Sequence, residues 1–199
     1  MKREQLEHIL RAASQIASDP NVLVLGSQSI LGTFTEDELP EKAHASIEAD
    51  VTFFNDHEND KSDVVDMHLG EDSHFHATFG YYAQGVNVEV ATLPAGWQDR
   101  VVVLTSPATN GASGHCLEPH DLVVAKLVAG RMKDLEFTDA LLHAELIAPD
   151  TLAARAQMLE QQFDTHRVVG WVVGWIAKHG QGKPATDGHR TTDRTGDQP

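Results

Sequence analysis

Apolar residues recur every three or four positions near the beginning of the chain, with charged residues between them, which predicts an amphipathic helix over residues 2–18. The pair Asp19-Pro20 ends this helix, because proline disfavours helical geometry in the residue before it. The next apolar segment, residues 22–26, reads VLVLG and has no polar alternation. Such a run is typical of a strand buried on both faces, and Gly26 ends it.

Two further segments alternate between apolar and polar residues, as half-buried strands do. Residues 47–54, IEADVTFF, put Glu48 and Asp50 on one face of the expected strand. Residues 86–93, VNVEVATL, put Glu89 on the polar side of a third expected strand. Carboxylates two residues apart leave the same face of a strand, about 6–7 Å apart at their Cα atoms.

Shorter stretches complete the first half of the chain. VVVL at residues 101–104 is another strand candidate, and the small polar residues 27–33 predict a short helix with Ser27 near its N-cap. An irregular acidic segment is expected over residues 35–46, and one or two helical turns over residues 64–69. Residues 105–116 are expected to form a loop.

Helical periodicity dominates from Glu118 onward. Helix is expected from this residue to Gly130 and again over residues 136–147, 149–162 and 164–178. The residues after 179 contain almost no apolar side chain, so they are expected to be disordered. The whole pattern predicts an α+β fold with a core over residues 1–117, a helical C-terminal part over residues 118–179 and a disordered tail over residues 180–199.

Composition and charge restrict the classes of partner. The 199-residue chain has 30 Asp and Glu against 15 Lys and Arg, which gives a formal net charge of −15. This charge disfavours broad binding to duplex DNA and to acidic membrane surfaces. The single cysteine, Cys116, excludes an intramolecular disulfide, and neither a signal peptide nor an apolar run near ~20 residues is visible. We therefore expect a cytoplasmic protein that does not bind membranes.

The polar faces of the expected strands carry the candidate chemistry. Mg²⁺ prefers oxygen ligands, and carboxylates at Glu48 and Asp50 that share divalent cations would lose their mutual repulsion. Glu89, on the third expected strand, would complete this cluster. Gly26 allows a phosphate to approach the backbone, and Ser27 supplies a hydroxyl and an N–H near a helix N-terminus.

These parts occur in the order of a known signature. VLVLGSQS, IEADVTF and VNVEV resemble the hydrophobic strand ending in Gly-Ser, the acidic-x-acidic strand and the third acidic strand of the nucleotidyltransferase (DNA polymerase β-like) superfamily. LGSQSILGTF, TLPAGWQDRVVVL and EPHDLVVAKLVAGRMKD resemble a small bacterial group of nucleotidyltransferase-like proteins, some of them linked to toxin–antitoxin systems. The resemblance covers residues 20–145. Glu48 stands where aspartate is commoner, and its spacing from Ser27 is long for compact members.

The resemblance implies a mixed β-sheet flanked by helices and a Mg²⁺-dependent transfer of a nucleoside monophosphate from an NTP, first of all ATP, to an acceptor hydroxyl. It implies metal binding and catalysis by Glu48, Asp50 and Glu89, and nucleotide binding by Gly26, Ser27 and Lys126. The acceptor stays open, with a protein or a tRNA as candidates, and so does a small partner protein. The alternatives are a non-catalytic binding module or toxin–antitoxin component with the same fold, and a hydrolase that uses water as the nucleophile.

Some of the singled-out residues also have ordinary structural interpretations. Lys126 could lie on a solvated helix face instead of in a cleft. Asp121 is expected to cap or orient the helix that follows Glu118. Trp171 and Trp175 belong to an apolar helix surface and are expected in the core, with an oligomer interface as the alternative.

Overall fold

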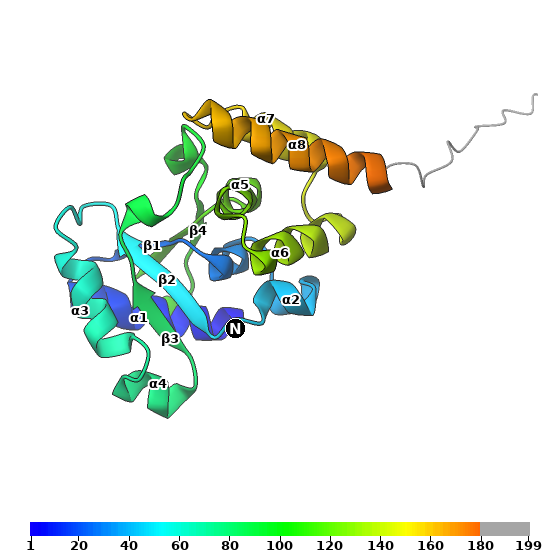
Figure 1. The fold of residues 1–199 in the computed structure, drawn as a ribbon. Coiled ribbons are helices and arrows are strands. Elements are labelled where there is room, and N and C mark those ends of the chain that lie inside the picture. Colours follow the sequence, from blue (N-terminus) through cyan, green and yellow to red (C-terminus); the bar gives the residue numbers. More distant parts are fainter. Residues whose placement is uncertain (180–199) are drawn as a thin grey trace, which may run out of the picture.

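A five-stranded mixed sheet forms the centre of the computed structural model, which describes residues 1–179 (Figure 1). Its strands are β1 (Asn21–Val24), β2 (Glu48–Phe53), β3 (Tyr82–Gly85), β4 (Val102–Leu104) and β5 (Ser113–Cys116). Their order across the sheet is β3-β2-β1-β5-β4. β1 pairs antiparallel with β2 and parallel with β5, whereas β2–β3 is parallel and β4–β5 is antiparallel.

The central strand, β1, is buried on both faces, as its unbroken apolar sequence predicts. Val22, Leu23 and Val24 are at most 1 % exposed. Both edges of the strand are paired, with Val24 opposite Val51 of β2 and opposite Cys116 of β5. Covered faces and paired edges leave this strand little freedom, which fixes the point where the chain leaves the sheet.

Helices α1 (Arg3–Ala17) and α3 (Asp60–Leu69) pack against each other and against the strands on one side of the sheet. α1 buries Leu6, Ile9 and Leu10 completely, which confirms the amphipathic helix predicted from the sequence. α3 is longer than the one or two turns expected, and the short helix α4 (His74–Phe79) follows it.

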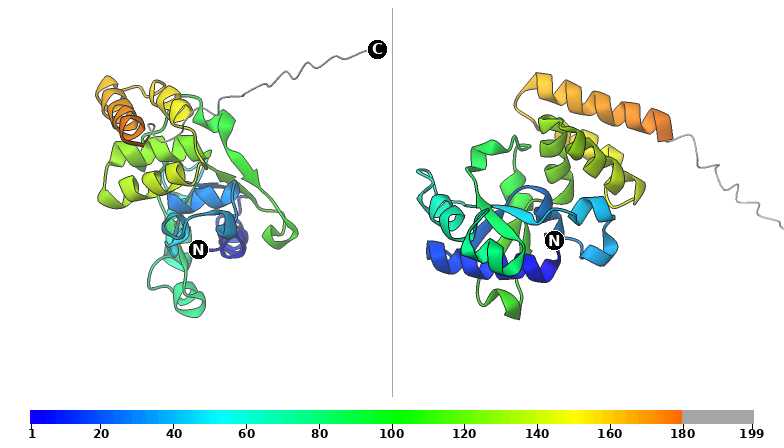
Figure 2. Two further views of the ribbon diagram at one scale, coloured as in Figure 1. Left: turned by 90° about the vertical axis from the view of Figure 1, so that its right-hand side faces the viewer. Right: turned by 60° about the horizontal axis from the view of Figure 1, so that its bottom comes forward.

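The C-terminal helices lie on the side of the sheet away from α1 and α3 in all the views (Figures 1 and 2). They are α5 (Pro119–Ala129), α6 (Met132–His143), α7 (Pro149–Ala156) and α8 (Gln162–His179). α5 contacts the other three, and Trp171 and Trp175 of α8 pack partly buried against the core. The change to helix near residue 118 and the α+β class are thus confirmed. Residues 180–199, predicted to be disordered, lie outside the described residues.

No helix within residues 1–179 is both long enough and apolar enough to cross a membrane.

The third strand was expected in the wrong place. β3 precedes the alternating valines, and the segment Val88–Val90 forms a single 3₁₀ turn. Val88 and Val90 are 36 % and 67 % exposed, so their alternation marks no buried face. Pairing with β2, and not the valine pattern, decides which residues become the strand, because β propensity depends strongly on tertiary context.

Two stretches expected to be irregular contain regular structure. Residues 105–116 include β5, whose sequence SGHC has little strand character, yet this strand lies between β1 and β4. Gly114 allows α1 to pack closely on this strand, since a Cβ there would lie 2.5 Å from Leu10 Cδ1 of α1. Residues 35–46 include a 3₁₀ turn at Glu36–Glu38 and the short helix α2 (Glu41–His44).

Asp121 orients α5 but does not cap it. The cap is Glu118, whose carboxylate accepts hydrogen bonds from the backbone N–H groups of His120 and Asp121. The Asp121 side chain is fully buried and accepts from Nε of Arg100 at 2.7 Å, and Nε of Arg155 lies 3.2 Å from its other oxygen. One carboxylate therefore ties α5 to the turn before β4 and to α7.

Replacing Asp121 by alanine removes the buried carboxylate that pairs with both Arg100 and Arg155. We expect Asp121→Ala to lower the free energy of unfolding by about 3 kcal/mol, the cost typical of breaking a buried ion pair on one side. Urea unfolding measures this loss. Asp99→Ala, which removes an exposed carboxylate, should change stability by no more than about 0.5 kcal/mol. Equal effects of the two substitutions would contradict a structural role for the Asp121 pairs.

Candidate active site

A polar pocket of about 270 Å³ lies between the end of β1 and the helices α2, α5 and α6. The predicted site residues Gly26, Ser27, Glu48, Asp50 and Lys126 all line it. The remaining lining residues are Lys42, Ala43, Ser46, Arg131, Lys133 and Phe137. The pocket therefore draws its walls from both the sheet and the helical part of the chain.

Gly26 lies against the carboxylate of Asp50. Its φ of +34° favours glycine, and a Cβ at this position would lie 1.7 Å from Oδ2 of Asp50. The backbone N–H of Leu25 donates to the carbonyl of Asp50 at 2.9 Å, which continues the pairing of β1 with β2. The Gly-Ser turn is thus packed directly on the second carboxylate of the acidic pair.

Burial and the Glu48 carboxylate destabilise the charge of Asp50 inside this pocket. Burial, together with the neighbouring Glu48 carboxylate, raises the pKa of Asp50 to about 6, and Lys126 and Lys133 only partly oppose this. The hydroxyl of Tyr82 donates to Oε2 of Glu48 at 3.3 Å. Burial and the nearby Glu48 raise the pKa of the Tyr82 hydroxyl to about 12, so it stays a donor. Two partly buried carboxylates that repel each other fit the oxygen ligands that Mg²⁺ takes.

Lys126 lies in the cleft and not on a solvated helix face. The residue is 8 % exposed, and its Nζ donates to Oγ of Ser27 at 3.0 Å and to Oδ1 of Asp134 at 3.2 Å. The ammonium also lies 4.5 Å from the ring centroid of Phe137. Burial lowers the pKa of Lys126, while the Asp134 carboxylate acts in the opposite direction. The side chain thus connects α5, α6 and the Gly-Ser turn.

Sequence reasoning missed most of the positive charge in the pocket. Arg131 and Lys133 follow the αL residue Gly130 (φ +66°), where the chain turns from α5 into α6. Arg131 pairs with Asp134 through two hydrogen bonds of 2.6 and 3.2 Å. Lys42 comes from α2, inside the segment expected to be irregular. The signal available for Arg131 and Lys133 was their closeness to Lys126 in sequence, whereas no sequence signal marks Lys42.

The structure does not bring Glu89 to the carboxylate pair. Glu89 is exposed in the 3₁₀ turn after β3, and the pocket is lined without it. The strand beside the pair presents other side chains, since Tyr82 lies opposite Glu48 and Gln84 lies opposite Asp50 in the β2–β3 register. Within the described residues, Glu89 therefore does not supply the third carboxylate that was expected beside Glu48 and Asp50.

Comparison with known protein families gives one match. A family model described as a nucleotidyltransferase of unknown function (DUF6036) matches residues 4–171 and thus includes the whole pocket. No curated protein and no solved structure matches the chain.

The repulsion between the carboxylates predicts that Asp50→Asn stabilises the protein without metal. Because the folded-state pKa of Asp50 is about 6 against an ordinary value of 3.8, ionising Asp50 costs stability, and this cost grows as pH rises from 4 through 6. We expect Asp50→Asn to raise the free energy of unfolding by about 2 kcal/mol at pH 7.5 in EDTA. The gain should shrink as pH falls towards 4. Urea unfolding across this range measures it, and a variant less stable than wild type at pH 7.5 would contradict the prediction.

Proposed function

Because the chain belongs to this family of nucleotidyltransferases of unknown function, we propose that it transfers a nucleoside monophosphate from an NTP to an acceptor hydroxyl in a Mg²⁺-dependent reaction. ATP is the first nucleotide to test. The observation that carries the proposal is a single polar pocket in which a carboxylate pair faces the buried ammonium of Lys126. Phosphoryl transfer depends mainly on positioning and charge neutralisation, and this pocket offers both kinds of group.

Glu48 and Asp50 would hold the metal. The repulsion that raises the pKa of Asp50 is the interaction that a divalent cation relieves, so the donor set fits such an ion. When bound, Mg²⁺ supplies charge neutralisation on the phosphates and activation of the attacking oxygen. Tyr82 donates a hydrogen bond to Glu48 and would keep that carboxylate oriented.

The basic residues would hold the phosphates. The Ser27 hydroxyl and the Lys126 ammonium lie together at the Gly-Ser turn and would contact the outer phosphates, with Arg131 and Lys133 beside them. In the reaction the acceptor oxygen bonds to the α-phosphorus and the bond from that phosphorus to the β-phosphate oxygen breaks. Pyrophosphate leaves with the bonding electrons, and the acceptor proton is lost to water. Helices α5–α8 would hold the base and the acceptor.

Two other functions of the same pocket give different experimental results. A non-catalytic binding module or toxin–antitoxin component would bind nucleotide without turnover, or would show no metal-dependent heat with Mg-ATP in calorimetry. A hydrolase would release phosphate or pyrophosphate without labelling any acceptor. Incubation with α-labelled ATP and candidate protein or tRNA acceptors separates both from a transferase.

The carboxylates are tested by a matched pair of substitutions. We expect Asp50→Asn to lower Mg²⁺-dependent nucleotide transfer about 100- to 1,000-fold, the loss typical of removing one electrostatic contribution in an active site. Glu89→Gln removes an exposed carboxylate of the same charge, and we expect transfer to fall less than about threefold. Incorporation of label from α-labelled ATP measures both. A Glu89→Gln variant as inactive as Asp50→Asn would indicate that Glu89 does belong to the site. An active Asp50→Asn variant would contradict the proposal.

Lys126 is tested through the phosphates. Lys126→Met keeps the apolar stem and removes the charge, and we expect it to weaken Mg-ATP binding by about 1.5–3 kcal/mol, the range for charge-assisted hydrogen bonds. Adenosine binding should change far less, because the outer phosphates are missing. Isothermal titration measures both ligands, and Lys61→Met, outside the pocket, serves as the control. Equal losses for ATP and adenosine would indicate damaged packing in place of a phosphate contact.

A further inference from the structure

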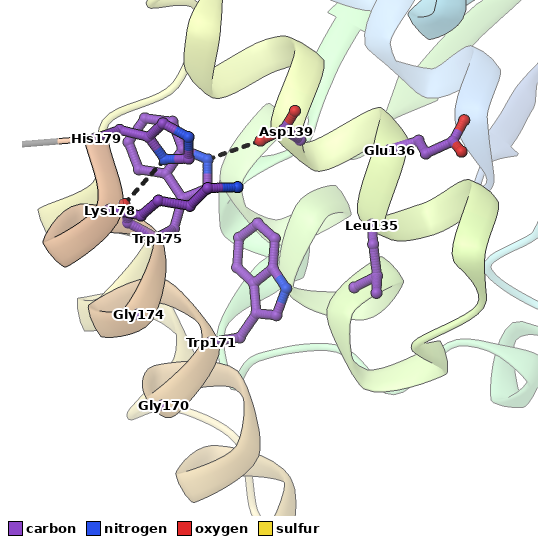
Figure 3. A pocket seen from close by; sticks show the side chains of 9 residues that line it. All are labelled: Leu135, Glu136, Asp139, Gly170, Trp171, Gly174, Trp175, Lys178 and His179. Atoms are coloured by element: carbon purple, nitrogen blue, oxygen red, sulfur yellow. Dashed lines mark hydrogen bonds between the residues drawn. The ribbon is translucent and has the colours of Figure 1, made fainter.

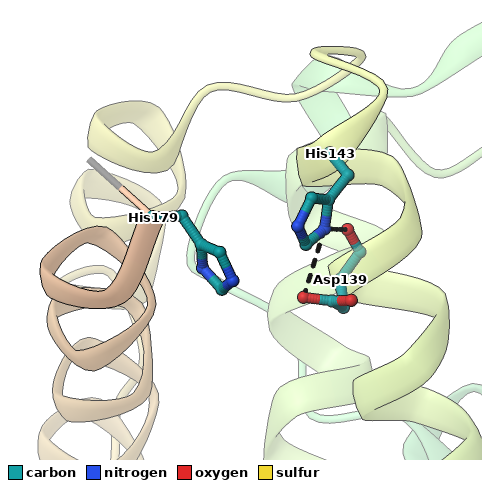
Figure 4. A group of neighbouring side chains, drawn as sticks. All are labelled: Asp139, His143 and His179. Atoms are coloured by element: carbon teal, nitrogen blue, oxygen red, sulfur yellow. Dashed lines mark hydrogen bonds and ion pairs between the residues drawn. The ribbon is translucent and has the colours of Figure 1, made fainter. Parts of the chain in front are cut away.

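A second cluster of potential ligands lies between α6 and α8, outside the nucleotide pocket (Figure 4). Asp139 and His143 come from successive turns of α6, and His179 is the last described residue of α8. A carboxylate oxygen of Asp139 and one nitrogen of each imidazole lie within 4.8 Å of one another. We propose that these three residues bind a zinc ion, with water as the remaining ligand.

The hydrogen bonds of both imidazoles leave a nitrogen ready for a metal. Nδ1 of His143 lies 2.8 Å from the carbonyl oxygen of Asp139, and Nδ1 of His179 lies 3.0 Å from the carbonyl oxygen of Trp175. A carbonyl oxygen only accepts, so each neutral ring carries its proton on Nδ1 and keeps the lone pair on Nε2. Metal-binding histidines show this pattern, in which a carbonyl or carboxylate fixes the tautomer from the far side of the ring.

Contacts from α8 and from its own helix, α6, hold the Asp139 carboxylate in place. The indole N–H of Trp175 donates to its Oδ1 at 2.9 Å (Figure 3), and Nδ1 of His143 lies 3.3 Å from the same oxygen. Two nitrogens and one carboxylate oxygen are a ligand set that zinc takes, with a fourth position left to water.

The cluster needs only a small adjustment to close around the ion. Zinc bonds of about 2.0–2.1 Å place tetrahedral ligand atoms roughly 3.3 Å apart, so the three residues must approach by up to about 1.5 Å. The His143 side chain is 51 % exposed, so it has room on its solvent side for such a shift. Open space adjoins the cluster, since Asp139 and His179 also line a pocket of about 470 Å³ beside Trp171 and Trp175 (Figure 3). A bound ion would connect the C-terminal end of α8 to α6.

Metal titration of the full chain, purified without a polyhistidine tag and stripped with a chelator, tests the site. We expect Zn²⁺ to bind at this cluster, and Co²⁺ in its place to give the intense visible absorption of a four-coordinate ion. His143→Ala and His179→Ala should each weaken Zn²⁺ binding at least about tenfold and abolish this absorption. The matched control, His166→Ala, removes an exposed histidine from α8, the helix that carries His179. It should leave Zn²⁺ binding and the Co²⁺ absorption unchanged. Asp50→Asn should also retain the absorption, which separates this site from the carboxylates of the nucleotide pocket.

Two results would overturn the assignment. One is a wild-type chain that shows no four-coordinate Co²⁺ spectrum. The other is Zn²⁺ binding by the His143→Ala and His179→Ala variants as tight as by His166→Ala, with all three folded in metal-free circular dichroism melts.

Discussion

The buried ammonium of Lys126 is the interaction on which the arrangement of the two parts of the chain depends. A charge removed from water costs several kcal/mol unless it is paired and hydrogen-bonded. Its partners come from different segments, Ser27 from the turn after β1 and Asp134 from α6. Asp134 is itself fully buried and is shared with Arg131, so these pairs hold α6 against α5.

A second constraint acts on the opposite wall of the pocket, where the backbone at Gly26 and the carboxylate of Asp50 touch. Any side chain at Gly26 would occupy the position of that carboxylate. The sheet thus presents a negative pair against the backbone of the Gly-Ser turn, and the helices present positive charge across from it. Ionised Asp50 costs stability at this wall, as is common where a fold keeps like charges together for chemistry.

The sequence predicted the parts of the site that depend on local pattern. A buried apolar strand ending in Gly26-Ser27 and two carboxylates on one face of β2 follow from spacing along the chain. The place of Lys126 in the pocket was implied by the family resemblance, with a solvated helix face as the alternative. The missing parts depend on tertiary contacts. β5 is a strand because it lies between β1 and β4, and Lys42 reaches the pocket because α2 packs beside α6. The valines around Glu89 alternate like a strand, yet pairing with β2 selects the residues before them.

The charges that line the pocket suit the ligand that we propose, whereas the net charge of the whole chain does not. A chain with a net charge of −15 repels nucleotides at long range, but salt screens such fields beyond about 8 Å. The lining has four cationic side chains and two carboxylates, and Asp134 and Glu136 pair with three of these cations, so positive and negative groups lie side by side. A nucleoside triphosphate alone would meet the repulsion of Glu48 and Asp50, and a divalent cation alone would meet the lysines. A metal–nucleotide complex places its cation at the carboxylates and its outer phosphates at Lys126, so both sets of charges are satisfied together.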